Sequence, residues 1–350
     1  MKTTQHRLLN QNAKDLKGIP DQSVALVVTS PPYPMIEMWD ELFIELRPEI
    51  KAHLDEGRSY KAFNLMHDVM NEIWEEVDRT VAPHGFVCIN IGDATRTING
   101  QFQMYSNHSK IIEKFVSMGY SVLPDIIWRK TTNAPNKFMG SGMLPSGAYV
   151  TYEHEYILIF RKGGKRVFKK DEIPNRQESA FFWEERNKWF SDLWEFQGKT
   201  QKFKNVVSTR ERSAAYPFEL AYRLINMYST KGDYVLDPFV GTGTTMFAAM
   251  CAERNSFGVE IDPLLSKTVA ENALLLKSDL NKIVTDRVER HAEFVIQEMA
   301  AGKDKWYDND YLNVPVKTRQ EVNIKLSLID SIEQTEDGII VKHVDLNPLQ

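Results

Sequence analysis

The chain has 350 residues, of which 42% are hydrophobic and 26% charged, and its formal net charge is −5 at pH 7. This length and composition are typical of a globular protein with one large domain or two smaller ones. We expect neither a membrane protein nor a secreted protein, because no window reaches the roughly 18 uninterrupted apolar residues of a membrane span and "MKTTQHRLLNQ" lacks the apolar core of a secretory signal. We therefore expect a cytoplasmic protein.

The first half of the chain alternates between strand and helix patterns. Short, β-branched apolar runs at 24–30 ("VALVVTS") and 85–92 ("GFVCINIG") predict parallel strands covered on both faces. Between them, residues 63–81 repeat apolar side chains at helical spacing and end at "APHG", which predicts a helix and therefore a β-α-β unit.

The pattern continues with a helix at 109–119 and two strands at 121–130 and 155–163. These two strands could be antiparallel, because no helix of crossover length separates them. Residues 131–147 are rich in Gly, Pro, Ser and Asn and predict a long loop, of a length typical of a lid or binding loop.

Basic and aromatic residues are concentrated in the next stretch. Residues 161–212 hold 14 Lys/Arg and 8 Asp/Glu, a local charge of +6, so that the remaining chain carries −11. Basic residues interleaved with aromatic ones suit a surface that neutralises phosphates and packs against sugars or bases. A small satellite core with solvated lysines is the equally weighted alternative. The Phe and Trp residues are Phe168, Phe181, Phe182, Trp183, Trp189, Phe190, Trp194, Phe196 and Phe203.

The strand and helix alternation then resumes. Helices are predicted at 218–229 and 244–254, and strands at 233–239 and 256–263. The turn between the first of these strands and its helix is "VGTGT". Two glycines in three residues remove side chains from a turn where the backbone must come close to a ligand, and amides at a helix N-terminus favour a polar or anionic group.

The residues around this turn indicate the type of ligand. Glu260 follows Asp237 by 23 residues and ends the next strand, where a carboxylate can accept both hydroxyls of a ribose. The pattern departs from the GxGxxG dinucleotide fingerprint, because Thr245 and Met246 occupy the place of the last glycine. S-adenosylmethionine fits better than a nicotinamide or flavin cofactor, since it has a ribose and an adenine but no pyrophosphate.

Two motifs together resemble a known family. "DPFVGTGTT" (237–245) is similar to the cofactor motif of the S-adenosylmethionine-dependent DNA amino-methyltransferases, and "TSPPY" (29–33) is similar to their catalytic motif in the form usual for enzymes that act on the N4 of cytosine. The catalytic motif comes first and a basic segment separates the two, as in the permuted class called beta. The resemblance covers roughly residues 5 to 275 and includes 212–225 and "NQNAKDL" (10–16), which resembles the family's first strand.

The resemblance implies a fold and a set of site residues. The fold is α/β and Rossmann-like, with a mostly parallel sheet of about seven strands, helices on both faces and a permuted motif order. The implied catalytic residues are Ser30, Pro31, Pro32 and Tyr33. The implied cofactor-binding residues are Asp237, Pro238, Phe239, Gly241, Gly243, Thr244, Glu260 and Ile261.

The chemistry of an exocyclic amine explains the catalytic motif. The amine is a poor nucleophile because its lone pair is delocalised into the ring, so catalysis requires acceptors that draw its hydrogens out of the plane. The family's chemistry implies two acceptors, for which the Ser30 hydroxyl and the Pro31 carbonyl are the candidates. Tyr33 offers a ring face for a base taken out of its stack.

The sequence thus predicts a site-specific methyltransferase that modifies the N4 of cytosine in double-stranded DNA, as a monomer or homodimer, with a restriction endonuclease as a possible partner. N6 of adenine is an alternative target, and a DNA-binding regulator without turnover is a non-enzyme alternative.

We expect a catalytic half at 1–160, a DNA-recognition insertion at 161–211, a cofactor half at 212–282 and an extension without assigned role at 283–350. The candidate DNA-binding residues are Lys169, Lys170, Arg176, Arg186, Lys202, Lys204 and Arg210.

Several other reactive residues have plainer interpretations. His154 and Glu155 open a strand and are interpreted as structural, and Asp93 follows a strand end where it could line the site without reacting. Cys88 and Cys251 are interpreted as buried free thiols, and no metal-ligand spacing is present. The segment after the catalytic motif either lines the base pocket or packs on the sheet as a helix; its candidates are Met35, Glu37, Met38, Trp39 and Asp40.

Overall fold

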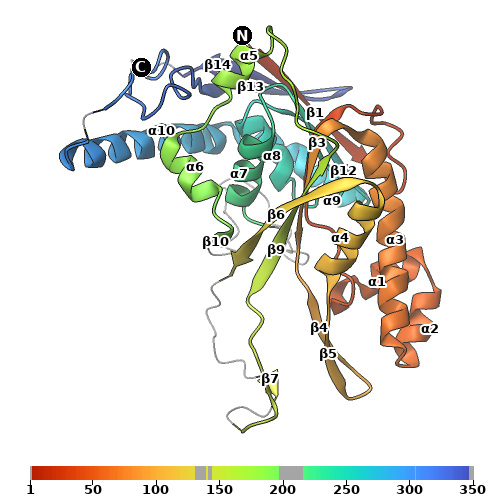
Figure 1. The fold of residues 1–350 in the computed structure, drawn as a ribbon. Coiled ribbons are helices and arrows are strands. Elements are labelled where there is room, and N and C mark those ends of the chain that lie inside the picture. The colour runs from red at the N-terminus through yellow and green to blue at the C-terminus, as the bar shows by residue number, and fades with distance from the viewer. Residues whose placement is uncertain (1, 131–138, 141–143, 197–215, 304, 347–350) are drawn as a thin grey trace.

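The computed structural model describes residues 2–130, 139–140, 144–196, 216–303 and 305–346. Its centre is a ten-stranded sheet with helices on both faces (Figure 1). Across the sheet the strands are β10 (Leu193–Glu195), β6 (Tyr120–Arg129), β9 (His154–Lys162), β3 (Val81–Ile91), β2 (Val24–Thr29), β11 (Tyr234–Asp237), β12 (Asn255–Glu260), β1 (Lys2–Asn10), β14 (Gly338–Asp345) and β13 (Ser327–Thr335).

The five central strands, from β3 to β1, are all parallel. On either side of them, β9 and β14 run in the opposite direction. Strand β2 (VALVVT) is buried over nearly its whole length, as an apolar strand covered by helices on both faces must be. The predicted α/β fold with a mostly parallel sheet is therefore confirmed, including the antiparallel pairing of the strands near 121–130 and 155–163.

Two helical layers cover the sheet. One layer contains α7 (Phe218–Tyr228), α8 (Thr244–Cys251), α9 (Pro263–Ala273) and α10 (Lys277–Ala300). The other contains α1 (Asp40–Leu46), α2 (Glu49–Asp55), α3 (Ser59–Thr80) and α4 (Asn107–Ser117). Each layer forms one apolar core with its face of the sheet, and Figure 1 shows α3 and α4 on the opposite side from α7 and α8.

The sheet has three more strands than the predicted seven, and its first strand was misplaced. The stretch at 10–16 was expected to form that strand, but β1 ends at Asn10 and a turn follows, in which the Asp15 N–H donates to the Asn12 carbonyl at 3.0 Å. The physical reason is that the buried side chains of β1 are polar. His6 bonds Thr4 at 2.9 Å and Ser256 at 2.8 Å, and burial lowers the pKa of His6 to about 3, so β1 lacks the apolar pattern of a core strand.

The C-terminal residues complete one end of the sheet. The hairpin of β13 and β14 joins the sheet through pairing of β14 with β1, and α10 packs against α8 and β13. Helix α6 (Trp183–Trp189) is attached to α10 by Arg287, which is buried and forms a double ion pair with Glu185 at 2.6 and 2.7 Å. The tail is therefore continuous with the central sheet.

Smaller elements project from the carboxyl edge of the parallel strands. The hairpin of β4 (Ala94–Ile98) and β5 (Gln101–Tyr105) follows β3, and β7 (Met139–Gly140) pairs with β8 (Ala148–Tyr149) between β6 and β9 (Figure 1). The rings of Phe102 and Tyr149 stack at 4.7 Å and connect the two projections. The first hairpin was not predicted, although its Asn99-Gly100 turn is a typical two-residue hairpin signal.

Candidate functional site

The two sequence motifs meet at the carboxyl edge of the sheet. Strands β2 and β11 are parallel neighbours, with Val27 opposite Leu236, so the residues that follow them lie side by side although they are more than 200 positions apart. The Thr29 hydroxyl donates to Asp237 Oδ1 at 2.6 Å and closes this junction. The carboxyl edge is where ligands bind in open α/β sheets.

Asp237 holds this junction together. Its side chain is 2% exposed and accepts hydrogen bonds from four donors. Oδ1 accepts from Thr29 and from the Phe239 N–H at 3.0 Å, and Oδ2 accepts from Tyr216 at 3.0 Å and Thr245 at 2.6 Å. Burial raises the pKa of Asp237, and these hydrogen bonds oppose the rise. All acceptor positions of the carboxylate are used within the protein, so Asp237 supports the turn from beneath.

The two glycines of the turn have different roles. Gly243 begins α8 with φ = +88°, and a Cβ there would lie 2.7 Å from both Phe247 and Val269, so this glycine allows α8 and α9 to pack closely. Gly241 also has a positive φ, +52°, but among the residues that the structure describes a Cβ there would contact only the Phe239 carbonyl oxygen, at 3.7 Å. The space beside Gly241 is therefore open, as a turn that receives a ligand requires.

Glu260 completes a cradle beside that space. Its Oε2 accepts from the Gly241 N–H at 3.1 Å, and its Oε1 accepts from the Asp262 N–H at 2.9 Å. A carboxylate has about four lone-pair positions, so each oxygen keeps one for a ligand hydroxyl. Burial raises the pKa of Glu260, against the effect of these two N–H groups. The next side chain, Ile261, is 49% exposed and supplies an apolar surface at the cradle.

The predicted catalytic motif, residues 29–33, forms a second cluster at the same edge. Ser30 Oγ lies 3.0 Å from the Tyr33 hydroxyl, which donates to Glu155 Oε2 at 3.0 Å. The Asn90 amide lies 2.9 Å from the Tyr33 oxygen and 2.6 Å from Glu155. Burial, and after it the Glu155 carboxylate, raises the pKa of Tyr33. Pro31 and Pro32, between Ser30 and Tyr33 in the sequence, are buried.

Glu155 and Asn90 are functional candidates that the sequence analysis missed. Glu155 was interpreted as a structural strand residue, but its carboxylate contacts the catalytic motif. An available signal was the charge itself, because Glu155 directly precedes the apolar run of β9. Tyr216 was also missed, and it bonds Asp237 at the junction of the two motifs.

Other residues near the motif divide between core and surface. Met35 is buried and its N–H donates to the sulfur of Met66, whereas Met38 and Glu37 are largely exposed. Asp40 forms a double ion pair with Arg96 at 2.7 and 2.9 Å. These side chains therefore do not share one environment, and both interpretations of the segment, as a lining of the base pocket or as a helix packed on the sheet, stay predictions. The remaining candidates have internal partners: Asp93 bonds His108 at 2.8 Å, and Trp39 packs on the apolar core of this layer.

The candidate DNA-binding residues lie in three places. Lys169, Lys170 and Arg176 lie at the amino edge of the sheet: Arg176 and Arg166 each lie 4.6 Å from the Phe168 ring, and Arg166 forms an ion pair at 2.8 Å with Asp233, which directly precedes β11. Arg186 is exposed on α6. Lys202, Lys204 and Arg210 lie outside the described residues. The structure therefore does not bring the first three together with Ser30.

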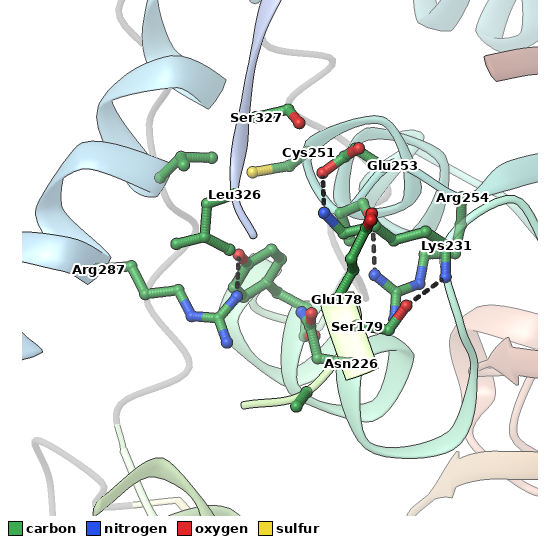
Figure 2. Close-up of a pocket in the computed structure, with 14 residues that line it drawn as sticks. Glu178, Ser179, Asn226, Lys231, Cys251, Glu253, Arg254, Arg287, Leu326 and Ser327 are labelled. Atoms are coloured by element: carbon green, nitrogen blue, oxygen red, sulfur yellow. Dashed lines mark hydrogen bonds and ion pairs between the residues drawn. The ribbon is translucent and has the colours of Figure 1, made fainter. Parts of the chain in front are cut away.

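A pocket elsewhere does not fit a nucleoside-sized ligand. It lies among α7, α8, α10 and β13 and is lined by charged groups, including Lys231, Glu253 and Arg254 (Figure 2). The space open to a water molecule is about 10 Å³, which is room for roughly one water. Within the part of the chain that the structure describes, no three His, Cys, Asp or Glu side chains gather as metal ligands, and no helix is long and apolar enough to cross a membrane.

Comparison with known proteins gives consistent matches. The N6/N4 methyltransferase family model, described as DNA methylase, matches residues 24–271. The chain is 54% identical over 333 residues to the type II methyltransferase M.MthZI of Methanothermobacter thermautotrophicus, covering 93% of this chain and 91% of that protein. It is 50% identical over 280 residues to the type II methyltransferase M.MjaI of Methanocaldococcus jannaschii, covering 77% and 91%.

A solved structure agrees with both fold and sequence. It is a putative DNA modification methylase of Thermus thermophilus in complex with S-adenosyl-L-methionine. The two chains are 31% identical with a TM-score of 0.59, and the match covers 77% of this chain and 95% of that one.

Proposed function

Because the chain belongs to the S-adenosylmethionine-dependent DNA methylases that modify N6 or N4 amines, we propose that it methylates the N4 amine of cytosine at a specific sequence in duplex DNA. The observation that carries the proposal is the position of Ser30, which bonds Tyr33 and directly follows Thr29, whose hydroxyl donates to Asp237. Its relatives are named type II methyltransferases, which supports a role as the protective half of a restriction-modification pair with a cognate endonuclease.

The cradle at Gly241 and Glu260 fits the cofactor. Glu260 would accept the two ribose hydroxyls with the lone pairs that its two N–H partners leave open. Ile261 would contact the adenine, and the turn from Pro238 to Thr244 would hold the methionine end at the start of α8. When bound, S-adenosylmethionine supplies an electrophilic methyl group on a positively charged sulfur.

The chain's own residues would prepare the amine. Ser30 Oγ accepts one amine hydrogen, and the Pro31 carbonyl accepts the other, because proline has no N–H and its fixed φ keeps the carbonyl out of the sheet ladder. The ring of Tyr33 packs on Gly92, where a Cβ would lie 3.0 Å from it, so the ring is fixed beside the extruded base. The bond from the amine nitrogen to the methyl group would form as the methyl–sulfur bond breaks, and the extra proton of the methylated amine would pass to solvent water, which leaves a neutral product.

The position of Ser30 requires the duplex to lie over the carboxyl edge. Within the proposed insertion 161–211, this favours DNA contacts by the stretch that contains Lys202, Lys204 and Arg210. The described residues on either side of that stretch lie at this edge, because Phe196 accepts from Trp128 and Tyr216 donates to Asp237. The same role for Lys169, Lys170 and Arg176 would require DNA to reach the opposite edge. We propose residues 1–160 and 212–282 as the catalytic and cofactor halves, with 283–350 as a sheet-extending tail.

The test is to express the protein in a host without DNA methylation and to analyse the nucleosides and the modified positions of its genome. We expect N4-methylcytosine within one recurring sequence. N6-methyladenine instead would identify adenine as the target, and an unmodified genome, with DNA binding intact in vitro, would indicate a regulator without turnover.

Glu260→Ala provides a separate test of the cofactor site. We expect S-adenosylmethionine to bind more weakly by about 1–3 kcal/mol, because the ribose hydroxyls lose a charged acceptor and the Gly241 N–H loses its partner. Calorimetric titration measures this difference. Glu271→Ala, on the exposed face of α9, is the matched control and should bind normally. Normal affinity in Glu260→Ala would place the ribose elsewhere.

A further inference from the structure

The catalytic motif is connected to a carboxylate that lies two strands away. Ser30 and Tyr33 follow β2, Asn90 lies on β3, and Glu155 lies on β9, so three neighbouring strands meet at one hydrogen-bonded cluster. Lys130, directly after β6, forms an ion pair with the other oxygen of Glu155 and lies 4.6 Å from the Trp128 ring. Oε2 of Glu155 is thereby left to Tyr33 and Asn90.

The hydrogens in this cluster can be assigned one by one. An ionised carboxylate only accepts, so the single hydroxyl hydrogen of Tyr33 points to Glu155 at 3.0 Å. The two amide hydrogens of Asn90 have their shortest acceptors in Glu155 at 2.6 Å and the Tyr33 oxygen at 2.9 Å. The second lone pair of Tyr33 is then available only to a donor, and Ser30 Oγ at 3.0 Å is placed to donate its hydrogen there.

This assignment determines what Ser30 offers to a substrate. With its one hydrogen directed to Tyr33, Ser30 presents lone pairs, and the Asn90 amide approaches one of them only at the long distance of 3.4 Å. A lone pair therefore remains for an incoming N–H group. If Tyr33 donated to Ser30 instead, the Ser30 hydrogen would be free to point at the amine, where it would repel the amine hydrogens and not accept one of them.

We infer that Glu155 is a positioning residue that, through Tyr33, directs the Ser30 hydrogen away from the substrate and so makes Ser30 an acceptor for the target amine. The inference rests on the proposed role of Ser30 and adds a residue to that site. Glu155 acts from behind Tyr33, so the substrate amine and the cofactor cradle are not in contact with it.

Glu155→Gln is the informative substitution, because it keeps the size of the side chain but places an N–H group where an acceptor stood. Tyr33 then no longer has a carboxylate to receive its hydrogen and can donate to Ser30. We expect kcat to fall about 10- to 100-fold, as for loss of a preorganised polar group at a reacting centre. The dissociation constants for S-adenosylmethionine and duplex DNA should stay within about twofold, because neither contact is altered. Glu155→Asp, which keeps the charge, should retain more activity than Glu155→Gln.

A double-mutant cycle with Tyr33→Phe separates this role from a general loss of structure. If Glu155 acts through the Tyr33 hydroxyl, Glu155→Gln should change kcat less than about twofold in the Tyr33→Phe background. The matched control is Glu333→Gln on strand β13 at the far end of the sheet, whose exposed carboxylate forms an ion pair with Lys342 and whose loss should leave kcat unchanged.

The outcomes are distinguishable from those of the proposed function. Full activity of Glu155→Gln together with loss of activity in Ser30→Ala overturns the inference and leaves the function intact. Independent, additive effects of Tyr33→Phe and Glu155→Gln also overturn it. Full activity of Ser30→Ala would instead remove the role of Ser30 from which both statements start. A lowered melting temperature of Glu155→Gln is resolved by Glu155→Asp, whose advantage in kcat must then persist at a temperature where both variants are folded.

Discussion

Ser30→Ala is expected to reduce the rate of methyl transfer by about 100-fold or more, because it removes one of two preorganised acceptors for the target amine. The Ser30 hydroxyl bonds Tyr33, whereas Glu260 bonds the Gly241 N–H, so affinity for S-adenosylmethionine should be nearly unchanged. The measurement is single-turnover transfer of a radiolabelled methyl group to duplex DNA, combined with calorimetric titration of the cofactor.

Ser109→Ala is the matched control for that substitution. Its hydroxyl donates only to the Ser106 carbonyl near the start of α4, on the exposed surface, and its loss should leave the rate within about twofold. A Ser30→Ala enzyme with more than half of the wild-type rate would exclude Ser30 from the mechanism. Loss of cofactor binding in the same variant would show that the two motifs are coupled more tightly than their separate contacts indicate.

Asp237→Ala is expected to give the largest loss of stability. The substitution leaves four donors without their acceptor in a buried site, among them the hydroxyls of Thr29, Tyr216 and Thr245. Unsatisfied buried groups cost about 1–3 kcal/mol each, and Thr245 can still donate to the Val28 carbonyl at 3.2 Å, so the free energy of unfolding should fall by about 3 kcal/mol or more. Cofactor affinity should also fall, because Asp237 holds the Phe239 N–H at the base of the turn.

Denaturant unfolding of three variants measures this effect. Asp237→Asn keeps one acceptor oxygen and can donate to hydroxyl oxygens, so it should lose less stability than Asp237→Ala. Asp192→Ala, at an exposed position before β10, should unfold like the wild type. If Asp237→Ala changed the free energy of unfolding by less than about 0.5 kcal/mol, the four hydrogen bonds would not be the support of the site.

Local features of the sequence were sufficient to predict where the two strands that carry the motifs end. In "VALVVTSPPY" and "YVLDPFVGTG" an apolar run stops at prolines or glycines, and this change of pattern marks a strand end wherever the segment folds. The fold class followed from the alternation of such runs with helical patterns. Strand β1 was misplaced because its buried side chains are polar and satisfied by partners on β12 and β14, which no local pattern reveals.

For the basic segment 161–212, composition predicted the local charge but not where that charge lies on the sheet. Its charge could be counted along the chain, but which edge of the sheet each lysine occupies depends on strand direction. The turn from β9 to α5 (Ile173–Glu178) places Arg176 beside the start of β11, while β10 lies at the carboxyl edge beside the end of β6. A segment that appears uniform in the sequence is therefore divided between opposite edges.

The sequence by itself determined the chemical groups of this protein: a serine and two prolines at one strand end, a glycine turn and a carboxylate at two others. Only the tertiary structure decided which of these groups touch. Thr29, next to Ser30, bonds Asp237 because β2 and β11 are neighbours, and Glu155 reaches Tyr33 because β9 lies antiparallel beside β3. The physical reason is that strand order across a sheet is selected by the burial of whole faces, which depends on the complete set of strands and helices, whereas a motif reports only its own few residues.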